Sequence, residues 1–261
     1  MTKARTYGEA LCVGELLQLQ KPFSPGEPQH DELQYVIIHQ CSELWFKLLL
    51  HEFDEICRLL AAGEPGRAAH LLRRCTRVVG LIDQGFGLME SMAAHDYALF
   101  RPYLTGGSGF QSAQFREVEI ALGCHRESTL HQPAFTAEEN ARIAGRLRQP
   151  TLWDAFVAAM RQAGYAMPDR TAAKTDPTEE ARAAECLRQM YVVGTHPELR
   201  AVSEEMTALD NAVSVWRFHH AVMAERAIGR KVGTGGEGVE YLYRTARIRC
   251  FPELMAVRTI L

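Results

Sequence analysis

The chain has 261 residues, of which 47% are hydrophobic and 23% charged, and its net charge at pH 7 is −3. These proportions are typical of a globular protein with a substantial core, and the absence of a basic run argues against nucleic acid or an anionic membrane surface as a partner. The first residues form no apolar signal-peptide core, and no later stretch is long and apolar enough to span a bilayer, so we expect a cytoplasmic protein. Seven cysteines without a C-x-x-C pair predict reduced packing residues.

Residues 1–30 lack helical periodicity and contain three prolines, at positions 22, 25 and 28. This composition predicts an arm with a loop that has no core of its own. Such an arm either lies against something else or is a disordered terminus, and the residues alone favour the disordered terminus.

From Asp31 onward the chain is a succession of helical patterns, without internal repeats or a convincing alternating strand pattern. We therefore predict an all-α fold and a single domain across residues 1–261. Residues 168–180 are polar and are the best candidate for a mobile linker. The predicted helical segments are 31–61, 66–92, 97–104, 111–122, two between 136 and 170 that separate at Gln149-Pro150, one ending at Val193, 197–229 and 238–249.

The first long helix carries Tyr35, His39 and Glu43 on one stripe, at i, i+4 spacing among branched apolar residues. Burial in such surroundings favours the neutral form of His39, which leaves one ring nitrogen free to accept a hydrogen bond. Farther along, Tyr97 and Arg101 stand one helical turn apart. An arginine fork captures a carboxylate through two hydrogen bonds, and the tyrosine hydroxyl can add a third; the alternative is a surface arginine without a role.

The helix over residues 197–229 carries adjacent histidines, His219 and His220. Neighbouring side chains on a helix point about 100° apart, so at most one of them can face a buried metal. His220 shares a face with Trp216, whereas His219 is expected to point toward Glu225 and solvent, which makes His220 the better candidate ligand. The alternative is an ordinary core histidine. The glycine loop at 233–238 matches G-x-G-x-x-G but follows a helix, which argues against a dinucleotide site.

Several segments together resemble the tryptophan 2,3-dioxygenases, a family of haem-dependent aromatic oxygenases. The most specific is WRFHHAVMAERAIGRKVGTGG, similar to the haem-ligand helix and glycine loop of that family. The others occur in the family's order and span nearly the whole chain: DELQYVIIHQCSELWFK (31–47), YALFRPYL (97–104), SGFQSAQFREVE (108–119) and FPEL (251–254).

The resemblance implies a bundle of long antiparallel helices that encloses haem b, with His220 as the axial iron ligand. It implies that His39 is the catalytic residue beside the indole N–H of an indole amino acid, and that Arg101 and Tyr97 hold the carboxylate. The remaining implied contacts are Tyr35 against the indole ring, Leu104 in the pocket wall, Thr234 at the ammonium or carboxylate end, and Trp216, Ser108 and Gly109 close to the haem. It also implies a homo-oligomer, most simply a tetramer, in which Tyr7 and Leu11 of the arm reach a neighbouring subunit's pocket.

The reaction that the resemblance implies is 2,3-dioxygenation of L-tryptophan, or a substituted tryptophan, by dioxygen to give N-formylkynurenine. Three departures from the family pattern favour an alternative, monooxygenation at indole C2 to a 2-oxindole: Tyr35 replaces the usual phenylalanine, Ala10 stands where an aromatic residue often does, and the glycine loop is one residue shorter. Two alternatives from other classes are a catalytically silent helical scaffold and a non-haem metal protein using His39 and His220. The set of matching site residues disfavours the former, and the lack of a matching carboxylate disfavours the latter.

Overall fold

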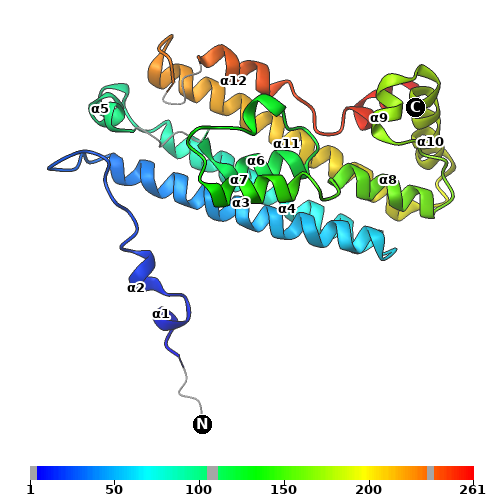
Figure 1. The fold of residues 1–261 in the computed structure, drawn as a ribbon, viewed down its shortest axis with the longest axis horizontal. Helices are drawn as coiled ribbons and strands as arrows, with labels where there is room; N and C mark the ends of the chain where they lie inside the picture. Colours follow the sequence, from blue (N-terminus) through cyan, green and yellow to red (C-terminus); the bar gives the residue numbers. More distant parts are fainter. Residues whose placement is uncertain (1–4, 105–110, 234–237) are drawn as a thin grey trace.

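The computed structural model describes residues 5–104, 111–233 and 238–261, and every regular element within these ranges is a helix (Figure 1). The predicted all-α fold is confirmed. The elements in chain order are α1 (Tyr7–Ala10), α2 (Val13–Leu16), α3 (Glu32–Ala61), α4 (Pro65–Met89), α5 (Ala94–Phe100), η1 (Arg101–Tyr103), α6 (Ala113–Ala121), η3 (Glu127–Thr129), α7 (Ala137–Arg146), α8 (Leu152–Gln162), α9 (Arg170–Thr175), α10 (Pro177–Val193), α11 (Pro197–Ile228), α12 (Val239–Ala246), α13 (Pro252–Ala256) and η4 (Val257–Ile260).

Three long helices, α3, α4 and α11, form the body of the molecule. The chain reverses between α3 and α4 at Gly63, whose φ of +74° suits glycine, and Pro65 opens α4 at a position where no backbone N–H is needed. These two helices are therefore antiparallel. The third long helix runs in the same direction as α4, because ion pairs join Arg73 to Glu205 near their beginnings and Asp83 to His219 near their ends.

The core lies where these three helices meet, since each contributes an apolar stripe at helical spacing. Fully buried side chains include Phe53 and Ile56 of α3, Leu72 of α4 and Leu209 of α11. Shorter helices cover this core: α6 and α8 pack on α3, and α12 packs on α11. The candidate site lies at one end of this body, beside the first half of α3, the last turn of α4 and the second half of α11.

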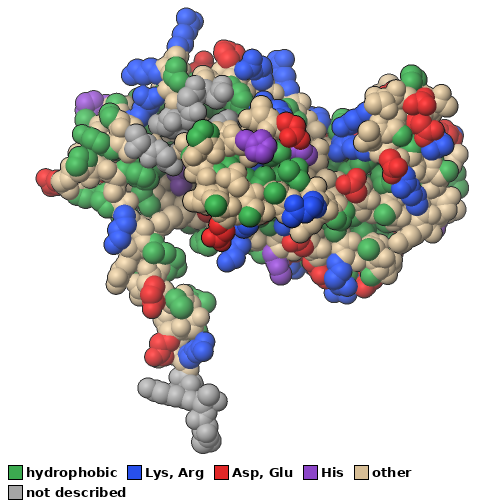
Figure 2. Space-filling view, in the orientation of Figure 1, with side chains coloured by type: hydrophobic (Ala, Val, Ile, Leu, Met, Phe, Trp, Pro, Cys, Tyr) green, Lys and Arg blue, Asp and Glu red, His purple; other side chains and the backbone are tan. Residues whose placement is uncertain are grey.

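The N-terminal arm leaves this body and carries α1 and α2, neither of which has a buried residue (Figure 1). Its root is fixed by Glu32, which is fully buried and accepts hydrogen bonds from the backbone N–H groups of Phe23 and Ser24. On the face shown in Figure 2, acidic and basic side chains are interspersed and no broad basic patch is present. None of the described helices is both long enough and apolar enough to cross a membrane.

The structure contradicts the predicted linker at residues 168–180. That segment forms α9 and the start of α10, and Asp176 caps α10 by accepting a hydrogen bond from the Thr178 N–H. It is held to the body by Arg170, whose guanidinium pairs with Glu253 at 2.7 Å and donates to the Cys250 carbonyl. The polar composition was misleading because these contacts come from residues about 80 positions away. The helix over residues 239–246 is also not the last, since α13 follows it.

Candidate active site

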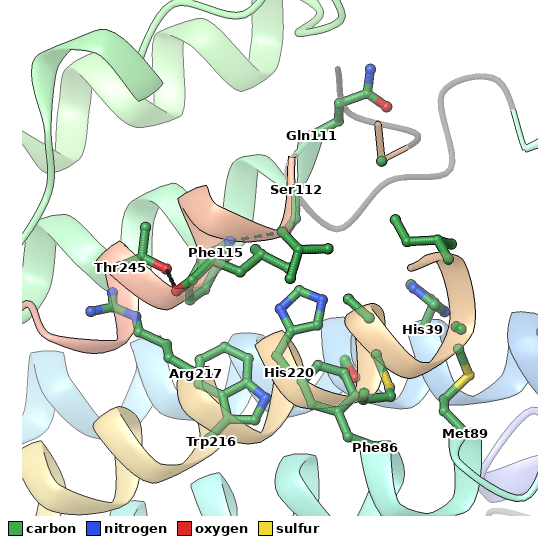
Figure 3. Close-up of a pocket in the computed structure, with 18 of the residues that line it drawn as sticks. His39, Phe86, Met89, Gln111, Ser112, Phe115, Trp216, Arg217, His220 and Thr245 are labelled. Carbon is green, nitrogen blue, oxygen red and sulfur yellow. Dashed lines mark hydrogen bonds between the residues drawn. The ribbon is translucent and has the colours of Figure 1, made fainter. Parts of the chain in front are cut away.

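A cavity of about 400 Å³ lies between α3, α4, α5, α6, α11 and α12. This volume is in the range of small-molecule and cofactor pockets. Most of its wall surface is apolar or aromatic, with polar side chains such as His39, Arg217 and His220 set in it (Figure 3). Both histidines singled out from the sequence, His39 and His220, line this cavity, from helices that are far apart in the chain.

His220 projects into the cavity from α11, with the Phe86 ring beside it at a centroid distance of 4.8 Å (Figure 3). Burial, together with the nearby His39 and His219, lowers the pKa of its imidazole to about 4. The ring is therefore neutral at pH 7 and carries a lone pair, which is the form that binds a metal.

His219 lies on a different face of α11 and is not among the cavity-lining residues. Its Nδ1 lies 2.7 Å from a carboxylate oxygen of Asp83, and its Nε2 lies 3.4 Å from one of Glu90, both on the α4 side. The prediction that only one of the two histidines faces the site is confirmed. The expected direction of His219 was wrong, because its ring pairs with Asp83 and Glu90 and not with Glu225.

His39 enters the cavity from α3. Its Nδ1–H donates to the backbone carbonyl of Tyr35 at 2.8 Å, so its Nε2 is left as the hydrogen-bond acceptor. Burial lowers the pKa of His39, as the sequence predicted for so apolar a setting. The Tyr35 ring lies against the imidazole, with centroids 4.0 Å apart, and fixes its orientation.

Tyr97 and Arg101 line the same cavity from α5 and η1. The Arg101 Nη2 donates to the Val232 carbonyl, on the segment that leads out of α11, and its buried Nε has no hydrogen-bond partner. Burial raises the pKa of Tyr97, while the adjacent Arg101 acts in the opposite direction through its charge and a hydrogen bond. Leu104 does not line the cavity. It is fully buried behind the wall against Tyr35 and Phe100.

The aromatic floor of the cavity is built around Trp216, one turn before His220 on α11. Its ring packs against Phe46, Phe86 and Phe115 at centroid distances of 5.3 to 6.1 Å. The indole Nε1 is buried and has no hydrogen-bond partner. The shared face of Trp216 and His220 is confirmed.

A charged cluster in the cavity wall was not singled out from the sequence. Glu119 of α6 accepts from Arg116 at 2.6 Å and from Arg217 at 2.8 Å, and all three side chains are buried although they line the cavity. The sequence does indicate part of this cluster, since Arg116 and Glu119 stand at i, i+3 spacing and a buried arginine needs a carboxylate partner. What the sequence could not show is that Arg217, almost 100 positions away, completes the cluster.

Three predicted site residues, Ser108, Gly109 and Thr234, lie outside the described residues. Two others, Tyr7 and Leu11, lie in the arm with 78% and 55% of their surface exposed, and neither lines the cavity of the same chain.

The cavity suits haem better than a directly bound metal ion. Within the described ranges no cluster of three or more His, Cys, Asp or Glu side chains could hold a metal, so a metal at His220 needs its other ligands from a macrocycle. Haem supplies four such ligands and requires from the protein an axial histidine and an apolar pocket. The unpaired buried atoms Arg101 Nε, Gln111 Oε1 and Trp216 Nε1 also fit a cavity that is completed by a polar-edged ligand.

The comparison with known proteins decides the family. A family model described as tryptophan 2,3-dioxygenase matches residues 1–167 and 183–261. The chain belongs to the tryptophan 2,3-dioxygenase family. Among proteins of that name, the one from Herpetosiphon aurantiacus is 39% identical over 99% of both chains, and the one from Caulobacter vibrioides is 37% identical over 99% of both chains. A third, from Polaromonas, is 36% identical over 97% of this chain and 87% of its own. The part of the chain that the tryptophan 2,3-dioxygenase model does not match, residues 168–182, is α9 and the start of α10.

Proposed function

We propose that this chain is a haem-dependent oxygenase that converts L-tryptophan to N-formylkynurenine by inserting both atoms of dioxygen across the indole C2–C3 bond. The observation that carries the proposal is the arrangement of His220, His39 and Arg101 around one apolar cavity: a neutral candidate ligand, a neutral acceptor and a cation. Relatives named tryptophan 2,3-dioxygenase, at up to 39% identity, support the same reaction.

His220 would hold the haem iron through Nε2, and Trp216, Phe86 and Phe115 would supply apolar contacts to the ring. Ser108 and Gly109 are the further residues that we assign to the haem. When bound, haem supplies the redox chemistry that activates dioxygen. The walls exclude water, which strengthens each polar contact inside the cavity.

Arg101 and Tyr97 orient the substrate. A guanidinium that lines a largely apolar cavity pairs with a carboxylate, and the Tyr97 hydroxyl adds a donor beside it. In this arrangement the indole ring points inward, toward the two histidines. We assign Thr234 to the ammonium or carboxylate end, and Tyr35, whose ring forms part of the wall, to the indole ring.

His39 receives the indole N–H. Because its Nδ1–H is committed to the Tyr35 carbonyl, Nε2 presents a lone pair, and the neutral ring repels neither the guanidinium nor an approaching indole. This hydrogen bond positions the indole and polarises its nitrogen. We therefore assign His39 as the catalytic residue that the protein supplies.

The arm completes the site in an oligomer. The exposed Tyr7 and Leu11 have no core of their own, and the aromatic and aliphatic surface that they present suits the mouth of an apolar cavity. We propose a homotetramer in which these residues reach a neighbouring subunit's cavity.

Labelled dioxygen tests the reaction. The holoenzyme is incubated with L-tryptophan, ascorbate and ¹⁸O₂, and the product is analysed by mass spectrometry. We expect two labelled oxygen atoms in a ring-opened product. A single labelled oxygen on an intact indole skeleton would contradict the proposal and establish the 2-oxindole alternative, for which the relatives give no support. The same reaction with a β-methylated tryptophan tests whether a substituted substrate is preferred.

A further inference from the structure

Two buried cysteines from distant parts of the chain meet behind the charged wall of the cavity. The Sγ atoms of Cys124, in the turn after α6, and Cys250, just before α13, lie 3.3 Å apart although the residues are 126 positions apart in sequence. A disulfide bond measures about 2.05 Å, so the two sulfur atoms need to approach by only roughly 1.3 Å to bond. The other five cysteines are also free thiols.

The backbone on both sides of this contact is fixed. The Cys250 N–H donates to the buried carboxylate of Asp210 at 2.9 Å. Arg170 donates to the carbonyl of Cys250 at 2.8 Å and to that of Gly123, the neighbour of Cys124, at 3.3 Å. One guanidinium thus bridges the two segments that carry the thiols. Asp210 and Arg170 thus fix the backbone beside the two thiols, which distinguishes this pair from two cysteines that only share a core.

The two thiols are electrostatically different. The Arg217 Nη2 lies 3.7 Å from the Cys124 Sγ, and the Cys250 thiol donates its hydrogen bond to the same sulfur. The hydrogen bond from Cys250, together with the Arg217 charge, lowers the pKa of Cys124 against the effects of burial and of the Glu119 carboxylate. The pKa of Cys250 is raised well above its ordinary value, first because it donates to Cys124. Cys124 is therefore the nucleophile of the pair and Cys250 its resolving partner.

We propose that Cys124 and Cys250 form a redox-active dithiol that hydrogen peroxide converts into a disulfide. The Cys124 thiolate attacks one peroxide oxygen, the O–O bond breaks, and the departing hydroxide takes up a proton to become water, which leaves Cys124 as a sulfenic acid. The Cys250 sulfur then attacks the Cys124 Sγ. The S–O bond breaks, and the hydroxyl group leaves as a second water with the Cys250 proton. Two thiols are oxidised and one peroxide is reduced.

The thiol pair lies directly behind the wall of the cavity. Glu119 and Arg217 both line the cavity, and Arg217 contacts the Cys124 sulfur, so one layer of side chains separates Cys124 from the cavity. Cys124 is also the more accessible thiol, 6% exposed against 0% for Cys250. The disulfide would tie the turn after α6 to the segment after α12, two of the elements that enclose the cavity.

Peptide mapping tests the proposal directly. Trypsin releases Cys124 in the peptide 117–126 and Cys250 in the peptide 250–258, each with a single cysteine. The purified holoenzyme is treated with graded hydrogen peroxide, its remaining thiols are alkylated under denaturing conditions, and the digest is analysed by mass spectrometry without reduction. We expect the two peptides to appear as one linked species that has lost two hydrogen atoms and separates on reduction. Because the crosslink closes a long loop, the oxidised protein should also unfold on the order of 5–15 °C higher.

The variants Cys250→Ser and Cys124→Ser test the order of events, and Cys186→Ser is the control. In Cys250→Ser, dimedone should trap a sulfenic acid on Cys124, and the linked peptide should be absent. Cys186→Ser removes another buried cysteine, on α10, and should give the same linked peptide as the unaltered chain. The proposal is overturned if Cys124 and Cys250 remain separately alkylated at peroxide concentrations that oxidise the exposed Cys12 and Cys41. The assignment of the nucleophile would be overturned if dimedone labelled Cys250 in the Cys124→Ser variant but did not label Cys124 in the Cys250→Ser variant.

Discussion

His219 and His220 are adjacent in sequence and opposite in environment, which shows how much a single residue position decides in this site. The neutral, cavity-facing His220 can act as a ligand, whereas the pKa of His219 is raised, with Asp83 and Glu90 outweighing its partial burial. Helical geometry was sufficient to predict that only one of them faces inward. It could not predict the carboxylate partners of His219, because they lie on another helix.

The first residue-scale prediction concerns Arg101, the cationic side chain that we propose binds the substrate carboxylate. Replacing Arg101 with alanine removes the guanidinium proposed to pair with the tryptophan carboxylate, a change that typically costs roughly 2–5 kcal/mol at a buried charge pair. We expect KM for L-tryptophan to rise at least tenfold while haem content stays normal. Arg226→Ala, an exposed arginine on α11, is the matched control and should leave KM unaltered. An unchanged KM in Arg101→Ala would show that the carboxylate is bound elsewhere.

The second residue-scale prediction concerns pH and His39. Its folded-state pKa is lowered by burial, so as the pH falls below about 6.5 the unfolded chain takes up a proton at this residue before the folded chain does. Folding stability is therefore lost as the pH falls from 7 toward 5.5. We expect the urea midpoint to fall more steeply with acid in the unaltered apoprotein than in His39→Leu. Parallel pH dependences in the two proteins would contradict a depressed pKa at His39.

At the scale of elements, the sequence predicted the long helices and their breaks well, and it failed where a short segment depends on distant contacts. The break between the predicted segments 31–61 and 66–92 could be predicted because the backbone chemistry of Gly63 and Pro65 is local. The helices α9 and α13 were missed because both are short and are held by residues from other parts of the chain. The Arg170–Glu253 pair connects them.

That ion pair gives the element-scale prediction. Arg170→Ala leaves the largely buried Glu253 without its partner and removes the bridge to the Gly123 and Cys250 carbonyls, so we expect a loss of roughly 2–4 kcal/mol in the free energy of unfolding. Asp169→Ala breaks a neighbouring but exposed pair with Arg161 and should cost at most about 1 kcal/mol. Equal urea midpoints for the two variants would show that α9 is not anchored through Arg170.

At the scale of the whole molecule, a single chain does not show what the helices of the N-terminal arm pack against. Glu32 fixes its root to α3, while α1 and α2 extend from the body with their apolar side chains exposed (Figure 1). The sequence identified the arm from its prolines and lack of periodicity. It could not place the arm, because the surface that would cover Tyr7 and Leu11 belongs to another copy of the chain in the proposed tetramer.

Deleting residues 1–20 tests this placement. We expect the truncated protein to bind haem normally and to have a higher KM for L-tryptophan, because each cavity loses the residues that a neighbour contributes. Light scattering on the full-length protein should give about four times the mass of one chain. A monomer with full activity, or a truncated protein with unchanged KM, would remove the shared-site proposal.

The central claim is that the cavity binds haem through His220, and haem content measures it most directly. The pyridine haemochrome assay is applied to the unaltered protein, to His220→Gly and to the matched neighbour His219→Gly, each purified after expression with excess haem. We predict stoichiometric haem in the unaltered protein and in His219→Gly, little in His220→Gly, and recovery in His220→Gly when free imidazole replaces the missing ring. Normal haem in His220→Gly, or a loss confined to His219→Gly, would contradict the account.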